Sequence, residues 1–179
     1  DAPACGESIE AILSADQVVL GPGSLYTSVL AATAVPGIAE AVRRSSARVV
    51  YVCNLHPQVS ETAGYGVADH VDALARHGLV PEVVLYDPDT IGGADGVVGA
   101  RGVRLAAANA LAHDPVLLGG ALAGDHHAIA RGQGLPIVAS GGLSLLLDLH
   151  SIEHLAVFHL TFFFGTSELK HTICKRGFT

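Results

Sequence analysis

Two glycines followed by hydroxyl side chains mark the segment QVVLGPGSLYTS, at residues 17–28, as the first candidate for chemistry. Its apolar VVL run predicts a buried strand, the glycine turn ends that strand, and Ser24 is expected to cap the helix that follows. The free N–H groups of a first helical turn favour anions, and Gly21 and Gly23 would let the backbone approach a ligand closely. The segment therefore predicts an anion site, at which Ser24 and Thr27 offer hydroxyl groups to phosphate or sugar oxygens.

The same residues also fit an ordinary turn between a strand and a helix, in which the glycines satisfy only backbone geometry. Short glycine motifs often occur by chance, so both interpretations stay open at this point. No Lys follows the second glycine, and the pattern G-x-G-x-x-G is absent from this segment. The segment therefore lacks the fingerprints of an ATPase and of a dinucleotide-binding protein.

A second polar segment, NLHPQVSETAGY at residues 54–65, follows the apolar run ARVVYVC. Asn54 could hold the edge of a uracil or a ribose, or could only close a turn. Glu61 could bind a sugar hydroxyl or act as a general base, although the absence of a paired acid in the pattern disfavours the catalytic role. Tyr65 could stack on a base, or could be a half-buried loop residue.

The pattern of apolar runs predicts the elements that position these two segments. The expected strands are 18–20, 47–53, 82–86 and 103–107, and the expected helices are 8–15, 25–32, 37–44, 67–77 and a last one from Asp114 to about Arg131. Strands that alternate with helices indicate an α/β fold, with a mostly parallel sheet and helices on both faces. In such a sheet the two polar segments leave their strands at the same edge, which predicts one shared ligand site.

Composition and charge narrow the classes of function. The chain of 179 residues carries a net charge of −7 and no basic run, which argues against a nucleic-acid surface. Its three cysteines show neither metal-ligand spacing nor even pairing, so a reduced, cytoplasmic setting is expected. His56, His70 and His113 show no metal-binding pattern, and capping or surface roles are favoured for them.

The end of the chain differs in composition from the body. All five Phe and both Lys residues lie after Ala156, whereas the preceding part is rich in Ala, Gly, Val and Arg. We therefore expect residues 1–131 to form part of an α/β domain and residues 132–179 to be a divergent or artefactual tail. Within that tail, charged and His residues interrupt the apolar stretch 143–166, which predicts a core helix or an irregular tail rather than a membrane span.

Several motifs occur together in one order: LGPGSLYTS, VYVCNL, ETAGY, ADHVDAL and HDPVLL. Over roughly residues 11–124 this order resembles the gluconeogenesis factor (YvcK-type) family of the CofD-like superfamily. The chain resembles the C-terminal part of such a protein, so the α/β domain is expected to be partial. The resemblance implies a Rossmann-like fold, a cytoplasmic location and the binding of UDP-sugars.

The resemblance also implies a role. The family resembled is regulatory and is needed for cell shape and cell-wall growth on gluconeogenic carbon, so a regulator without turnover of its own is expected, with a nucleotide-sugar as its partner and homo-oligomerisation left open. The more distant CofD relatives are 2-phospho-L-lactate transferases of coenzyme F420 biosynthesis, and a transferase of that kind is the alternative. Neither a catalytic residue, nor a metal ligand, nor a cofactor is assigned.

The resemblance places the expected ligand-binding residues in three groups. The family's glycine loop aligns with Gly21, Gly23, Ser24, Leu25 and Thr27, and its second polar segment aligns with Asn54, Gln58, Glu61, Thr62 and Tyr65. Arg101 and Arg104 are expected as phosphate partners, because a guanidinium binds phosphate oxygens in a bidentate manner.

Overall fold

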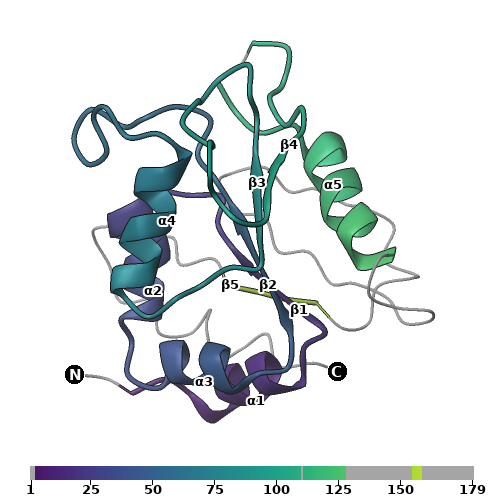
Figure 1. The fold of residues 1–179 in the computed structure, drawn as a ribbon. Helices are drawn as coiled ribbons and strands as arrows, with labels where there is room; N and C mark the ends of the chain where they lie inside the picture. Colours follow the sequence, from purple (N-terminus) through teal and green to yellow (C-terminus); the bar gives the residue numbers. More distant parts are fainter. Residues whose placement is uncertain (1–2, 110, 128–154, 159–179) are drawn as a thin grey trace, which may run out of the picture.

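The computed structural model describes residues 3–109, 111–127 and 155–158, which form a parallel sheet with helices on both faces (Figure 1). The helices are α1 (Gly6–Ser14), the π-helix η1 (Leu25–Leu30), α2 (Ala31–Thr33), α3 (Ile38–Arg44), α4 (Val67–Arg76) and α5 (Pro115–His127). The strands are β1 (Gln17–Leu20), β2 (Arg48–Val52), β3 (Val83–Tyr86), β4 (Ala100–Gly102) and β5 (Leu155–Phe158). The α/β fold predicted from the alternation of strands and helices is confirmed.

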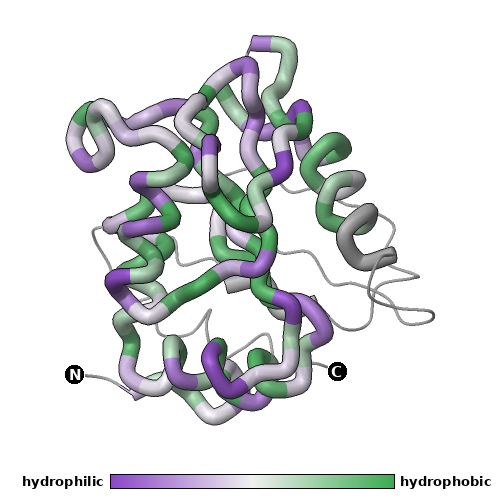
Figure 2. Tube along the Cα trace, in the orientation of Figure 1, coloured by the Kyte–Doolittle hydropathy of each residue, from purple (hydrophilic) through white to green (hydrophobic). Residues whose placement is uncertain are grey.

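The described strands pair in the order β4-β3-β2-β1-β5, and every pairing is parallel. All four residues of β1 are buried, and so are the last four of β2. This burial explains why both strands are continuous apolar runs rather than alternating patterns. The hydropathy colouring shows apolar residues along these strands and along α5 (Figure 2).

Each face of the sheet carries its own apolar core. On β1, Val18 and Leu20 belong to the core that packs against α1, α3 and α4, whereas Val19 belongs to the core that packs against α5. Successive side chains of a strand point to opposite faces, so a fully apolar strand supplies both cores. Accordingly, α2 and α4 lie on one side of the strands and α5 lies on the other (Figure 1).

The expected strand at residues 103–107 is wrong. On its side away from β2, β3 pairs with β4, which ends at Gly102. The N–H groups of Leu105 and Ala106 instead donate to the carboxylate of Asp87, so they are unavailable to a neighbouring strand. The segment is apolar because both residues are buried against α5, not because it lies in the sheet.

The expectation of a core helix or an irregular tail within residues 143–166 is wrong for the four residues that are described there. Leu155–Phe158 forms strand β5, which pairs with β1 in parallel along its full length. The remainder of the expected tail, residues 132–154 and 159–179, lies outside the described residues, as does the predicted end of the last helix near Arg131.

No single described helix is long and apolar enough to cross a membrane. Taken together, the helical segments Leu25–Thr33 and Ile38–Arg44 pass that test by length and composition, but they are bent by 73° at their junction.

Candidate functional site

The two polar segments leave neighbouring strands at one edge of the sheet, as predicted. β1 and β2 are parallel and in register, with Leu20 opposite Tyr51. The glycine loop (residues 21–28) follows β1, and the polar loop (residues 54–65) follows β2, so both begin at the carboxyl ends of the strands. Ligands of open α/β sheets bind at this edge.

Glu61 joins the two loops directly. Its Oε2 accepts a hydrogen bond of 3.3 Å from the backbone N–H of Tyr26, and its Oε1 accepts one from the hydroxyl group of Thr27. Both donors belong to the first turn of η1, where N–H groups have no partner within the helix. A carboxylate of the polar loop therefore occupies the end of the helix that the sequence predicted would meet a phosphate.

Two tyrosines form a second contact between the loops. The hydroxyl groups of Tyr26 and Tyr65 are 3.0 Å apart, and this hydrogen bond raises the pKa of Tyr65. The rings of Tyr65 and His70 lie nearly perpendicular, at 89°, with 5.7 Å between the ring centroids. Tyr65 is thus held from two sides, which fixes the orientation of its ring at the rim of the site.

The surface role favoured for His70 is wrong. Its side chain is fully buried, and its Nδ1 lies 2.9 Å from the carbonyl oxygen of Gly66. Among the described residues, its Nε2 has no hydrogen-bond partner. Burial lowers the pKa of His70, although the Gly66 carbonyl and the nearby Asp69 act in the opposite direction. Burial therefore favours the neutral imidazole, whose ring contacts that of Tyr65.

The two glycines of the glycine loop serve different needs. Gly21 has a φ of +90°, and a Cβ atom there would lie 2.8 Å from the carbonyl oxygen of Val52. The positive φ and the close approach to the end of β2 explain why this residue is glycine, so no ligand is needed to explain it. A Cβ atom at Gly23 would lie 3.4 Å from the Cβ of Ser28, an ordinary contact. Of the two positions, only Gly23 could accept a Cβ atom. Only there does the fold leave the glycine unexplained, so that the close approach of a ligand can explain it.

Ser24 precedes η1 as expected, but its side chain makes no capping hydrogen bond. Its carbonyl oxygen instead accepts from the N–H groups of Ser28 and Val29, at 3.1 and 3.0 Å, and the second bond has the wide spacing of a π-helix. Such turns occur often at functional sites. The expected capping role of the Ser24 hydroxyl is wrong, and this half-buried group remains accessible to a ligand.

The polar loop is stiffened by bonds within itself. The Thr62 hydroxyl accepts from the N–H of Gln58, and the N–H groups of Glu61 and Thr62 both donate to the Gln58 carbonyl oxygen. Thr62 and Leu25 are fully buried, so neither side chain offers a ligand any surface. Asn54 is buried at the end of β2, whereas Gln58 is half-buried.

Arg101 and Arg104 are not brought to the contacts between the loops. Arg101 lies on β4 and Arg104 just after it, and the intervening strand β3 puts β4 about 10 Å from β2. Both arginines are exposed. They lie at the far flank of the same edge, where they would reach only an extended ligand.

Asp87 positions this flank and was not among the residues predicted for the site. Its Oδ2 accepts from the N–H groups of Leu105 and Ala106 at 2.7 and 2.8 Å, and its Oδ1 accepts from Asp89 at 3.1 Å. Burial alone would raise the pKa of Asp87, but these N–H groups and the charge of Arg104 lower it below its ordinary value. An Asp directly after a buried strand was the available signal.

Cys53 is a small buried residue at the end of β2. It is 1% exposed, and burial raises the pKa of its thiol to about 12. Its carbonyl oxygen lies 3.2 Å from Nε2 of His113, which ties the segment before α5 to the end of β2. Asp114, where the last helix was expected to begin, caps α5, because its carboxylate accepts from the N–H groups of Val116 and Leu117.

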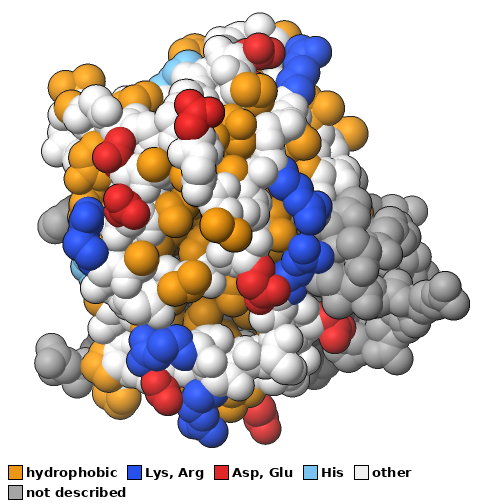
Figure 3. Space-filling view, viewed as in Figure 1, with side chains coloured by type: hydrophobic (Ala, Val, Ile, Leu, Met, Phe, Trp, Pro, Cys, Tyr) orange, Lys and Arg blue, Asp and Glu red, His pale blue; other side chains and the backbone are white. Residues whose placement is uncertain are grey.

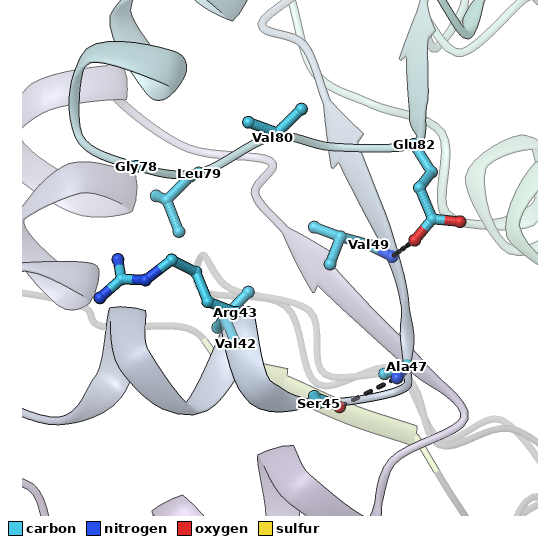
Figure 4. A pocket seen from close by; sticks show the side chains of 9 residues that line it. All are labelled: Val42, Arg43, Ser45, Ala47, Val49, Gly78, Leu79, Val80 and Glu82. Carbon is cyan, nitrogen blue, oxygen red and sulfur yellow. Dashed lines mark hydrogen bonds between the residues drawn. The ribbon is translucent and has the colours of Figure 1, made fainter.

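Two hollows of the described part lie away from these loops. A cavity of about 290 Å³ opens at the amino ends of β2 and β3, between Arg43 and Glu82 (Figure 4). A groove of about 600 Å³ runs between α4 and residues 95–98, and its walls include Val80 and Val98. Apolar side chains are exposed beside acidic ones on the face shown in Figure 3. Among the described residues, His, Cys, Asp and Glu form no group of three that could hold a metal ion.

The fold and this edge define a Rossmann-like α/β protein whose two strand-end loops meet at one candidate ligand site. The chain belongs to the CofD family, because the family model described as 2-phospho-L-lactate transferase CofD matches residues 1–105.

Curated relatives and a solved structure agree with this assignment. The chain is 49% identical over 83 residues to the gluconeogenesis factor of Halalkalibacterium halodurans, a match that covers 45% of this chain and 26% of that protein. It is 48% identical over 84 residues to the putative gluconeogenesis factor of Deinococcus radiodurans, covering 46% of this chain and 18% of that protein. The chain thus spans about a quarter or less of these relatives. The crystal structure of a UPF0052 family member from Bacillus halodurans has a TM-score of 0.62 at 33% identity, over 69% of this chain and 47% of that one.

Proposed function

We propose that this chain binds a nucleotide-sugar, of the UDP-sugar class, between the glycine loop and the polar loop. The observation that carries the proposal is the direct contact of the two loops through Glu61 and through the Tyr26–Tyr65 pair. Groups suited to sugar and phosphate oxygens gather there, including the free hydroxyl of Ser24 and the first turn of η1. The resemblance of its motifs to the gluconeogenesis factor family implies the same class of ligand.

The proposed role is regulatory. The protein would sense the nucleotide-sugar in the cytoplasm and adjust cell shape and cell-wall growth under gluconeogenic conditions, without turning the ligand over. Cys53 is not arranged for catalysis, because burial raises the pKa of its thiol to about 12 and the thiol stays protonated. The similarity to curated gluconeogenesis factors supports this role over a transferase.

Binding at this edge is testable with a hydroxyl that the fold does not use. Isothermal titration calorimetry of the chain with UDP-N-acetylglucosamine should give saturable binding. Ser24→Ala should weaken it about tenfold, because one hydrogen bond to a charged group is lost, and should leave the unfolding temperature unchanged. Ser46→Ala, an exposed serine before β2 at the opposite edge, is the matched control. Equal affinities for both variants would place the ligand elsewhere.

The family description itself favours one alternative, a phospholactate transferase. Incubation with a deazaflavin and a nucleotide-activated phospholactate would separate the two functions. New fluorescence of the F420 type would identify a transferase, whereas binding without product supports the regulator.

A further inference from the structure

We propose that Glu61 is an internal competitor for the phosphate groups of the ligand, and that ligand binding displaces its carboxylate from η1. This inference rests on the proposed function and adds a mechanism by which the site is kept closed. It departs from the sequence-based roles of Glu61, in which the carboxylate was to contact a sugar hydroxyl or act as a base.

The competition follows from which atoms Glu61 occupies. Its two carboxylate oxygens take the N–H of Tyr26 and the hydroxyl of Thr27, at the beginning of the helical segment Leu25–Thr33. These donors are the ones that a phosphate at the glycine loop would need. A carboxylate bound there already supplies the negative charge that the N-terminal end of a helix favours.

A phosphate and the Glu61 carboxylate cannot share this position. Two negative charges a few ångströms apart repel each other strongly near a protein surface, where screening by water is incomplete. Each donor also has a limited number of hydrogen atoms to offer, so a phosphate oxygen must replace a carboxylate oxygen rather than join it. A ligand without phosphate would lack the charge needed to take these donors from Glu61.

The release requires only that the Glu61 side chain turns away. The backbone of the polar loop is held independently of the carboxylate, because Gln58 bonds to both Glu61 and Thr62 through their N–H groups. The second link, between Tyr26 and Tyr65, does not involve Glu61 either. Glu61 is half-buried, so its carboxylate can reach water once released. The two loops therefore stay in place while the position for phosphate is cleared.

The test compares the chain with its Glu61→Gln variant by calorimetry, using UDP-N-acetylglucosamine, inorganic diphosphate and uridine. Glutamine keeps the size of the side chain and removes its charge. The variant should bind the first two ligands about tenfold more tightly and uridine unchanged. Glu10→Gln, which removes one exposed charge from α1, is the control for net charge and should bind as the unaltered chain does.

A second measurement follows the carboxylate itself. In the chain labelled with ¹³C at glutamate carboxyl groups, the Glu61 resonance is the one that the Glu61→Gln variant lacks. On addition of UDP-N-acetylglucosamine it should move to the position of a solvated carboxylate. An unmoved resonance, or an affinity that Glu61→Gln leaves equal or lowers, would overturn the competition while leaving the nucleotide-sugar site intact. No binding by either form would overturn the proposed function and this inference together.

Discussion

Among the carboxylates that bind backbone N–H groups, Asp87 and Glu61 both lie near the carboxyl edge of the sheet, and they differ in how completely the fold encloses them. Asp87 is 1% exposed and accepts from three N–H groups, at Leu105, Ala106 and Asp89. Glu61 is half-buried and accepts from one N–H group and one hydroxyl. The chemistry of the two contacts is similar, but only the second can exchange its partners for water or a ligand.

This difference teaches what burial does to a charged contact. A buried carboxylate must keep its donors, since losing one leaves an unsolvated charge, and the lowered pKa of Asp87 reflects how well its donors compensate for burial. A half-exposed carboxylate has water as an alternative partner, so its contact contributes little to stability. We therefore interpret Asp87 as a carboxylate that stabilises the fold, and Glu61 as a carboxylate that a ligand can displace.

Asp87→Asn should produce the largest effect on stability. An amide can accept through one oxygen only, so its NH₂ group would face an N–H donor that Asp87 now satisfies. We expect a loss of about 3 kcal/mol in the free energy of unfolding, measured with urea at neutral pH. Asp89→Asn is the matched control, because Asp89 is exposed and contributes its backbone N–H rather than its carboxylate. Equal losses would remove the special role of Asp87.

The same variant has a pH signature. The pKa of Asp87 is lower in the folded chain than in the unfolded chain, where it is about 3.9. Its stabilisation is therefore fully present above the unfolded value and is lost as the pH falls through the folded value. Acid unfolding of Asp87→Asn should lack this component, so the stability of the two proteins should converge at low pH.

The sheet and the meeting of its two loops were predictable because they depend on local patterns. Continuous apolar runs identify β1 and β2, and the alternation with helices makes them parallel, which places both loops at one edge. The position of β4 was not predictable in this way. Leu105 and Ala106 are apolar because they are buried, but whether they pair with a strand depends on a carboxylate 18 and 19 residues earlier.

The details of the site were predictable only in part. The sequence indicated that Glu61 would lie at the site, but charge complementarity alone predicts a phosphate at η1, not a carboxylate from the same chain. The burial of His70 was predictable from its spacing, although a surface role was favoured. His70 lies three residues after Val67 and four before Leu74, on the buried face of α4.

His70→Gln should have an intermediate effect, visible in the pH dependence of stability. Burial lowers the pKa of His70 in the folded chain, whereas in the unfolded chain this pKa is about 6.5. As the pH falls through about 6.5, the unfolded chain takes up a proton at His70 before the folded chain does, so the free energy of unfolding falls. The variant should lose less stability than the unaltered chain between neutral pH and pH 5, as followed by thermal unfolding. His77→Gln is the control, since His77 is exposed directly after the same helix and its Nδ1 similarly lies 2.8 Å from the carbonyl oxygen of Ala73. Identical slopes for both variants would mean that His70 does not titrate with folding.

Glu61→Gln should produce the smallest change in stability, about 0.5 kcal/mol or less, because a half-exposed charged contact competes with water. The free energy of unfolding from urea titration at neutral pH, measured beside Asp87→Asn, tests the comparison directly. If Glu61→Gln lowered the free energy of unfolding as much as Asp87→Asn does, the Glu61 carboxylate would also stabilise the fold. The arrangement of the two loops would then depend on it. A small cost together with tighter binding of diphosphate would show that the chain keeps a charge at this site for control of the ligand rather than for the fold.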